Sequence, residues 1–97
     1  MLTGCEGSIV RDATTDSLFL SVPNNAHVVR LNMTVFQSAD QGASWQEYAS
    51  VDSGSVAYSS LQVLPNGGLG LLYERSDNAS LVFEPQEIRY WVVNKNL

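Results

Sequence analysis

Few side chains in this 97-residue sequence are of the types that carry out chemistry. Its single histidine, His27, lies in a polar loop, and its single cysteine, Cys5, is expected to be a small buried hydrophobic residue. No group of His, Cys, Asp and Glu has the spacing of a metal site, so we expect neither a metal nor another cofactor. The remaining groups are arginines, which can bind a carboxylate, and tyrosine phenols, which need an adjacent base to react because their pKa is about 10.

The strongest local pattern is Ser38-Ala39-Asp40-Gln41-Gly42-Ala43-Ser44-Trp45, which reads S-x-D-x-G-x-x-W. Its residue types suit a tight turn between two strands, because Asp40 can accept backbone hydrogen bonds within the turn and Gly42 can adopt a positive φ. Trp45 supplies a large apolar ring to pack against the sheet. The pattern resembles the Asp box of sialidases and related propeller proteins. Ser38, Asp40, Gly42 and Trp45 are thus interpreted as structural residues of a corner, and they indicate a fold rather than a reaction.

Composition limits the classes of protein that this chain can be. It has the length of one small domain, 44% hydrophobic residues and a net charge of −5. No basic patch can neutralise phosphates or hold an anionic membrane surface, so we expect no nucleic-acid partner. An anionic small molecule is still allowed, because one or two well-placed arginines can bind it locally. No apolar run is long enough for a transmembrane segment, and residues 1–5 do not have the pattern of a signal peptide.

Short apolar runs separated by turn residues predict an all-β chain without helices. Pro23-Asn24-Asn25 should close one strand, residues 52–55 should separate two others, and Pro65-Asn66-Gly67-Gly68 is a strong hairpin signal. The expected strands cover residues 8–10, 18–22, 31–37, 46–51, 58–64, 69–74, 81–83 and 88–93.

Four strands, a loop and a second, incomplete set of strands are typical of a β-propeller, whose blades have four antiparallel strands in about 40–50 residues. We expect about two blades, one over residues 5–52 with the Asp box and a final, incomplete one over residues 55–93. Because blades bury their faces against their neighbours, two blades cannot close a ring, and the chain is expected to be a fragment of a larger toroid. A free-standing β-sandwich is the alternative interpretation of the same strands.

Several segments, in their order along the chain, resemble the C-terminal part of the catalytic domain of exo-α-sialidases (neuraminidases) of the bacterial and lysosomal type. The likeness extends over about residues 5–93, and the segments are Cys5–Ile9, Leu20–Pro23, Arg30–Val35, the Asp box, Ala57–Leu61 and Gly70–Glu74. The resemblance implies a partial six-bladed propeller. It also implies a parent glycoside hydrolase that cleaves terminal sialic acid from glycoconjugates with retention of configuration, through a tyrosine nucleophile.

Three residues take roles from this resemblance. Tyr58, within Ala57–Leu61, is the expected nucleophile, and a phenol suits the substrate because the sialic acid carboxylate would repel a carboxylate nucleophile. Arg30 matches one arginine of the triad that binds that carboxylate. Glu74 matches an acid that orients another arginine of the triad from behind the site. The other three arginines have no such context and are interpreted as surface charges.

The resemblance also implies parts that this chain lacks. In the family, two more triad arginines, the acid/base residue and the glutamate that activates the tyrosine lie upstream. We therefore expect the isolated chain to be inactive, and we expect its partners to be a sialylated glycan and the remaining blades of the parent chain. A lysosomal or secreted protein is favoured over a cytoplasmic one. The alternative is a non-catalytic Asp-box propeller module that binds glycans or acts as a scaffold, which Tyr58 and Arg30 at opposite ends of the sheet would favour.

Overall fold

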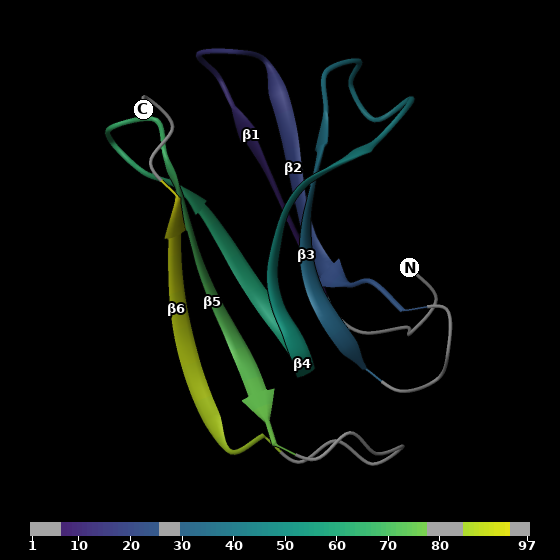
Figure 1. The fold of residues 1–97 in the computed structure, drawn as a ribbon. Coiled ribbons are helices and arrows are strands. Elements are labelled where there is room, and N and C mark those ends of the chain that lie inside the picture. The colour runs from purple at the N-terminus through teal and green to yellow at the C-terminus, as the bar shows by residue number, and fades with distance from the viewer. Residues whose placement is uncertain (1–6, 26–29, 78–84, 94–97) are drawn as a thin grey trace.

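The computed structural model describes residues 7–25, 30–77 and 85–93, and all the regular structure in these residues is β-strand. Each strand pairs antiparallel with the next along the chain, which gives a single six-stranded sheet that curls into a half-barrel (Figure 1). The prediction of an all-β chain is confirmed for these residues, and none of them belongs to a helix that could cross a membrane. The strands are β1 (Ser8–Asp12), β2 (Ser17–Pro23), β3 (Leu31–Ser38), β4 (Gln46–Val63), β5 (Leu69–Ser76) and β6 (Glu87–Val93).

Most of the expected strands have a counterpart in the sheet. Those at residues 8–10, 18–22, 31–37, 69–74 and 88–93 correspond to β1, β2, β3, β5 and β6, whereas residues 81–83 lie outside the described residues. β2 ends at Pro23 as expected, and the hairpin between β4 and β5 forms where Asn66-Gly67 predicts it. Gly67 has a φ of 85° there, a value that favours glycine.

The predicted break at residues 52–55 is wrong, because these residues lie inside the 18-residue strand β4. The first half of β4 pairs with β3 and the second half with β5, and Ser55 is opposite both Leu31 and Ser76. Register shifts on either side of Ser55 let the strand bend and change its partner without leaving the sheet. The polar and glycine residues that resemble a turn therefore mark a bend within one strand.

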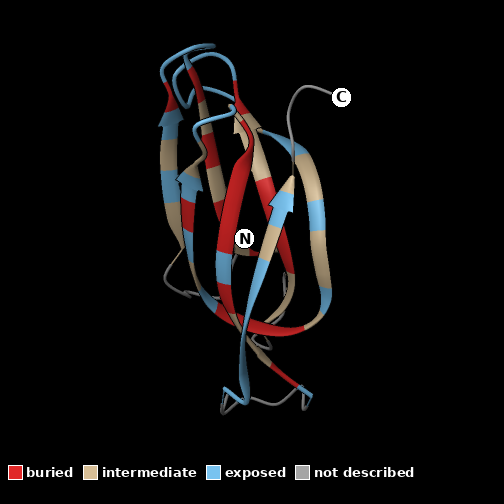
Figure 2. Cartoon of the chain, turned by 90° about the vertical axis from the view of Figure 1, so that its left-hand side faces the viewer, coloured by how far each residue is buried: buried red, intermediate tan, exposed pale blue. Residues whose placement is uncertain are grey.

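This bend turns the two halves of the sheet toward each other. The second half of β4 reaches β1 and β2, where the Leu61 N–H donates to Ser8 Oγ at 2.9 Å and the hydroxyls of Ser21 and Ser59 are 2.8 Å apart. Side chains from β2 to β5 fill the space between the halves, and buried positions of the strands are red in Figure 2. The buried cluster consists of Phe19, Met33, Val35, Val56, Leu61, Leu69, Leu71 and Tyr73.

The outer face of β5 and β6 carries large apolar side chains that the described residues do not bury. Leu72 is opposite Tyr90, and Ile88 and Val92 flank Tyr90 on the same side of β6. Their exposed fractions run from 42% for Val92 to 66% for Ile88, and most of β6 is exposed (Figure 2).

Candidate functional site

Arg30, Tyr58 and Glu74, the residues expected in the site, lie together at the end of the sheet where β3 begins. Arg30 immediately precedes β3, Tyr58 follows the bend of β4, and Glu74 is in β5. The Val56 N–H donates to the Arg30 carbonyl at 3.0 Å, which ties the start of β3 to the bend. The Arg30 guanidinium carbon is 5.7 Å from the centre of the Tyr58 ring, and the Tyr58 N–H donates to Glu74 Oε1 at 3.3 Å. Strand pairing thus gathers three residues that are far apart in the sequence.

Tyr58 is 47% exposed and forms part of a shallow, mainly apolar pocket of about 270 Å³. Leu72 and Ile88 contribute apolar surface to this pocket, and the Glu74 carboxylate contributes its charge. The site therefore combines an accessible phenol with a hydrophobic surface, as sites for partly apolar ligands do. The pocket is lined by Tyr58, Ser59, Ser60, Leu72, Tyr73, Glu74 and Ile88.

Arg30 differs from the other arginines in its partners. Arg11 forms an ion pair with Asp16 at 2.6 Å, and Arg75 and Arg89 pair with other carboxylates. Among the described residues, no carboxylate pairs with Arg30, whose charge lies over the Tyr58 ring instead. Such a cation–π contact contributes only about 0.5–1 kcal/mol at an exposed site. The guanidinium of Arg30 is therefore available to a ligand, and a carboxylate is the group that fits its planar donors.

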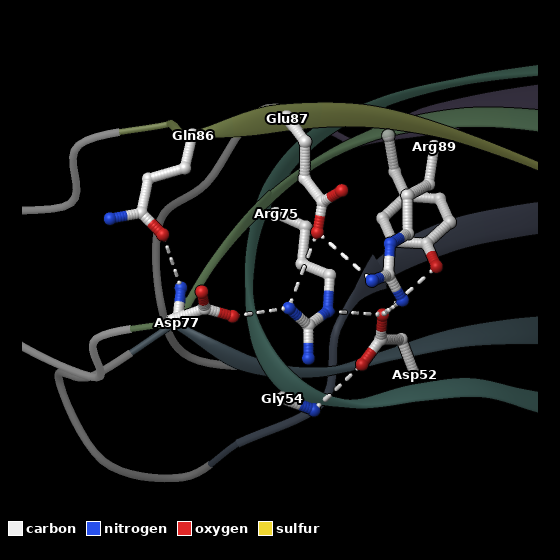
Figure 3. A network of polar contacts seen from close by, with 8 residues as sticks. Asp52, Gly54, Arg75, Asp77, Gln86, Glu87 and Arg89 are labelled. Carbon is white, nitrogen blue, oxygen red and sulfur yellow. Dashed lines mark hydrogen bonds and ion pairs between the residues drawn. The ribbon is translucent and has the colours of Figure 1, made fainter.

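A charged network holds the bend of β4 (Figure 3), and it reaches the pocket through Tyr73. Asp52 Oδ2 accepts hydrogen bonds from the Tyr73 hydroxyl at 2.9 Å and from Arg75 Nε at 3.0 Å, and Asp52 Oδ1 accepts the Gly54 N–H at 2.9 Å. Burial favours the neutral acid, but the bonds from Gly54 and Tyr73 and the charge of Arg75 lower the pKa of Asp52 below its usual value. Burial, followed by the bond to Asp52, raises the pKa of the Tyr73 phenol.

The interpretation of Arg75 as a surface charge is wrong, because its side chain is only 20% exposed and pairs with three carboxylates. Arg89 joins the same network through Glu87 at 2.9 Å, although it is more exposed. No local pattern in the sequence marks this network, because its members come together only through the pairing of β4, β5 and β6. Its carboxylates, apart from Asp52 itself, are Asp77 and Glu87.

The Asp-box turn connects β3 to β4 at the other end of β3 from Arg30. Ser38 Oγ donates to Asp40 Oδ1 and accepts the Gly42 N–H, both at 2.8 Å. Ser44 donates to Asp40 twice, from its N–H at 2.8 Å and from its Oγ at 2.5 Å. These bonds, those from Ser44 first, lower the pKa of Asp40 from 3.8 to about 2. Gly42 has a φ of 92°, which a residue with a side chain would adopt only with strain.

Trp45 is half-buried and is not part of the core cluster. The aromatic contact at the core is made by Phe19 and by Tyr48, which packs against the cluster, with ring centres 5.1 Å apart. Trp45 lies at a cavity of about 270 Å³ beside the turn. The residues that line this cavity are Gln37, Ala39, Asp40, Ser44, Trp45 and Gln46.

No family model and no curated protein sequence matches this chain. The roles of Tyr58, Arg30 and Glu74 therefore rest on the resemblance stated above and on the positions of the three residues. Within the parts of the chain that the structure describes, no three His, Cys, Asp or Glu side chains are grouped to hold a metal ion. Cys5 and His27 lie outside those parts.

Proposed function

We propose that this chain is part of the catalytic domain of an exo-α-sialidase, in which Tyr58 is the nucleophile and Arg30 binds the carboxylate of sialic acid. The observation that carries the proposal is the position of the Arg30 guanidinium 5.7 Å from the Tyr58 ring, with no carboxylate partner among the described residues. The anomeric carbon of sialic acid bears the carboxylate directly. The nucleophile must therefore lie beside the group that binds that carboxylate, as Tyr58 does beside Arg30.

The proposed reaction begins with attack of the Tyr58 oxygen on the anomeric carbon. The glycosidic bond breaks, the leaving oxygen receives a proton from an acid, and water later hydrolyses the tyrosyl intermediate with overall retention. The phenol must lose its proton to a base as it attacks. Glu74 binds the backbone N–H of Tyr58, and no carboxylate among the described residues is hydrogen-bonded to its hydroxyl. The base and the acid are thus assigned to other blades of the parent chain, and the chain alone is expected to be inactive.

The shape of the sheet supports the assignment of two propeller blades. Strands β1, β2, β3 and the first half of β4 would form one four-stranded blade, and the second half of β4 would begin the next blade with β5 and β6. In a propeller the last strand of one blade leads to the inner strand of the next. The hydrogen bond from Leu61 to Ser8 puts the second half of β4 beside β1, as two neighbouring inner strands would lie.

The exposed apolar face of β5 and β6 also supports a larger assembly of sheets. Tyr90 and Val92, which do not line the Tyr58 pocket, form an exposed apolar surface of the kind that marks a protein–protein contact, and a further blade would bury it. A free-standing β-sandwich gives no reason for such a surface. The residues that remain exposed therefore favour the propeller over the sandwich.

The proposal is tested by titrating the chain with N-acetylneuraminic acid while the side-chain NMR signals of Arg30 and Tyr58 are recorded. We expect weak, saturable shifts that disappear in Arg30→Gln and that the methyl ester of the sugar, which lacks the negative charge, does not produce. Arg89→Gln is the matched control, because Arg89 is half-exposed but bound to Glu87. Binding that survives Arg30→Gln would indicate a non-catalytic glycan-binding module. Turnover of a fluorogenic sialoside by the chain alone, if lost in Tyr58→Phe, would contradict its expected inactivity.

A further inference from the structure

We propose that the cavity beside the Asp-box turn is a second ligand site, which binds one neutral hexose unit of a glycan. The cavity has a volume of about 270 Å³ and lies at the end of β3 opposite to Arg30 and Tyr58. Small-molecule pockets begin at about 300 Å³, so this cavity fits a single ring rather than an oligosaccharide. The proposal does not depend on the sialidase assignment, because none of the residues that line this cavity belongs to the Tyr58 site.

Several polar groups around the cavity remain free to bind a ligand. The Asp40 Oδ2 atom accepts one hydrogen bond, from Ser44 Oγ, and retains a further lone pair. Gln37 uses its amide N–H to bind Ser17 Oγ, which leaves its carbonyl oxygen as an acceptor. Among the described residues, neither the Gln46 amide nor the Trp45 indole N–H is paired with a protein group. Donors and acceptors therefore converge on one small space, as the hydroxyl groups of a sugar require.

The charge of the cavity disfavours an anionic ligand. With a pKa of about 2, Asp40 is ionised throughout the physiological range and can only accept hydrogen bonds. Among the residues that the structure describes, no cationic side chain lines the cavity, so a carboxylate or a phosphate would be repelled rather than held. Sugar hydroxyls can donate to Asp40, and the Trp45 ring offers an apolar surface for the C–H groups of a pyranose. This chemistry contrasts with that of Arg30, which suits an anion.

The position of the cavity separates its ligand from the proposed reaction. Arg30 immediately precedes β3 and the Asp-box turn immediately follows it, so a sugar in the cavity is not the residue that is cleaved. A site of this kind would hold the protein on a glycan while the other end of the sheet is free to act. Binding by one small pocket is expected to be weak, because few groups take part.

The test follows the two tryptophan indole N–H signals in a ¹⁵N-labelled sample of the chain during titration with methyl glycosides of galactose, glucose and mannose. The Trp45 signal should shift and saturate with at least one of these neutral sugars. The Trp91 signal is an internal control, because Trp91 lies in β6, away from the cavity. Absence of a saturable Trp45 shift with any neutral sugar overturns the proposal, as does a shift with N-acetylneuraminic acid alone.

A matched pair of variants locates the binding. Gln46→Ala removes a free amide from the cavity and should weaken binding about fivefold, the effect of one lost hydrogen bond. Gln62→Ala makes the same change at an exposed position further along β4 and should leave the affinity unchanged. Both residues are exposed, so neither change is expected to unfold the sheet. Equal affinity of Gln46→Ala and the unchanged chain would overturn the proposal. The titration with sialic acid at Arg30 is a separate experiment, and its result does not depend on this outcome.

Discussion

The two ends of β3 are held by different kinds of contact. At the Asp-box end, Ser38, Asp40 and Ser44 bond to one another within seven residues of sequence. At the other end, Arg30 and Tyr58 meet from different strands, and the network around Asp52 joins β4 to β5 and β6. One end is thus stabilised by local contacts, whereas the other depends on the whole sheet being paired in register.

This difference explains which polar groups remain free at each end. The Asp-box turn uses most of its donors and acceptors to fix its own conformation. At the Tyr58 end, the ion pairs of Asp52 and Arg75 hold the strands, and Arg30 and Tyr58 make few contacts of their own. The residues that stabilise this end are therefore separate from those proposed to bind a ligand, which is an arrangement that keeps the proposed site rigid and still accessible.

The largest effect is expected from Asp52→Ala, which should lower the free energy of unfolding by about 2–3 kcal/mol. The change leaves the Tyr73 hydroxyl and Arg75 Nε, both partly buried, without their acceptor. Asp77→Ala is the matched control, because Asp77 pairs with the same arginine but its side chain is 77% exposed. The control should lose less than about 1 kcal/mol in urea unfolding. Equal losses would mean that the network stabilises this end no more than a surface ion pair does.

A smaller effect is expected at the Asp-box end, where Ser38→Ala should cost about 1–2 kcal/mol. The buried Ser38 hydroxyl both donates to Asp40 and accepts the Gly42 N–H. Alanine can make neither bond, so the Asp40 carboxylate and the Gly42 N–H must bond to water instead. Ser60→Ala, at an exposed position of β4, should stay within about 0.5 kcal/mol of the unchanged chain. The measurement is the midpoint of urea unfolding at constant slope. A loss from Ser38→Ala as small as that of the control would count against the turn as a self-stabilised unit.

The alkaline dependence of stability should distinguish the two ends, whereas the lowered pKa values of Asp40 and Asp52 give both ends an acid dependence. The folded pKa of Asp40, about 2, is below its ordinary value of 3.8, so its contribution is complete above that value and is lost as the pH falls through about 2. Asp40→Asn should therefore reduce the acid dependence of unfolding. The pKa of Tyr73 is raised above 10.0, so its contribution is complete below that pH and is lost as the pH rises further. Tyr73→Phe should reduce the alkaline dependence instead. Loss of the alkaline dependence in Asp40→Asn, or its persistence in Tyr73→Phe, would contradict this assignment.

The structural features that the sequence predicted best are those that depend only on neighbouring residues. The strand-ending Pro23, the hairpin at Asn66-Gly67 and a turn over residues 38–45 all follow from the local conformational preferences of their residue types. The bend in β4 could not be predicted in this way. Asp52-Ser53-Gly54-Ser55 has the composition of a turn, and only the change of partner from β3 to β5 keeps it inside a strand.

The sequence could predict members of the candidate site but not the ion pairs beside them. Tyr58, Arg30 and Glu74 were expected from the order of segments along the chain, and the sheet brings them together. The partners of Arg75 could not be inferred, because Asp52 precedes it by 23 residues and Glu87 follows it by 12. Ion pairs of this kind depend on strand register, which the full set of cross-strand contacts determines.

The smallest effect is expected for the contact between Arg30 and Tyr58 themselves. A double-mutant cycle with Arg30→Gln and Tyr58→Leu should give a coupling energy of about 0.5 kcal/mol, because Tyr58 is 47% exposed and water competes with the cation–π contact. The same cycle with Arg11→Gln should give no coupling, since Arg11 pairs with Asp16. A coupling energy above about 2 kcal/mol would make this pair a structural element like Asp52 and Arg75. A small coupling energy means that the Arg30 guanidinium can leave the Tyr58 ring for a carboxylate at little cost. Binding of sialic acid beside Tyr58 requires this exchange.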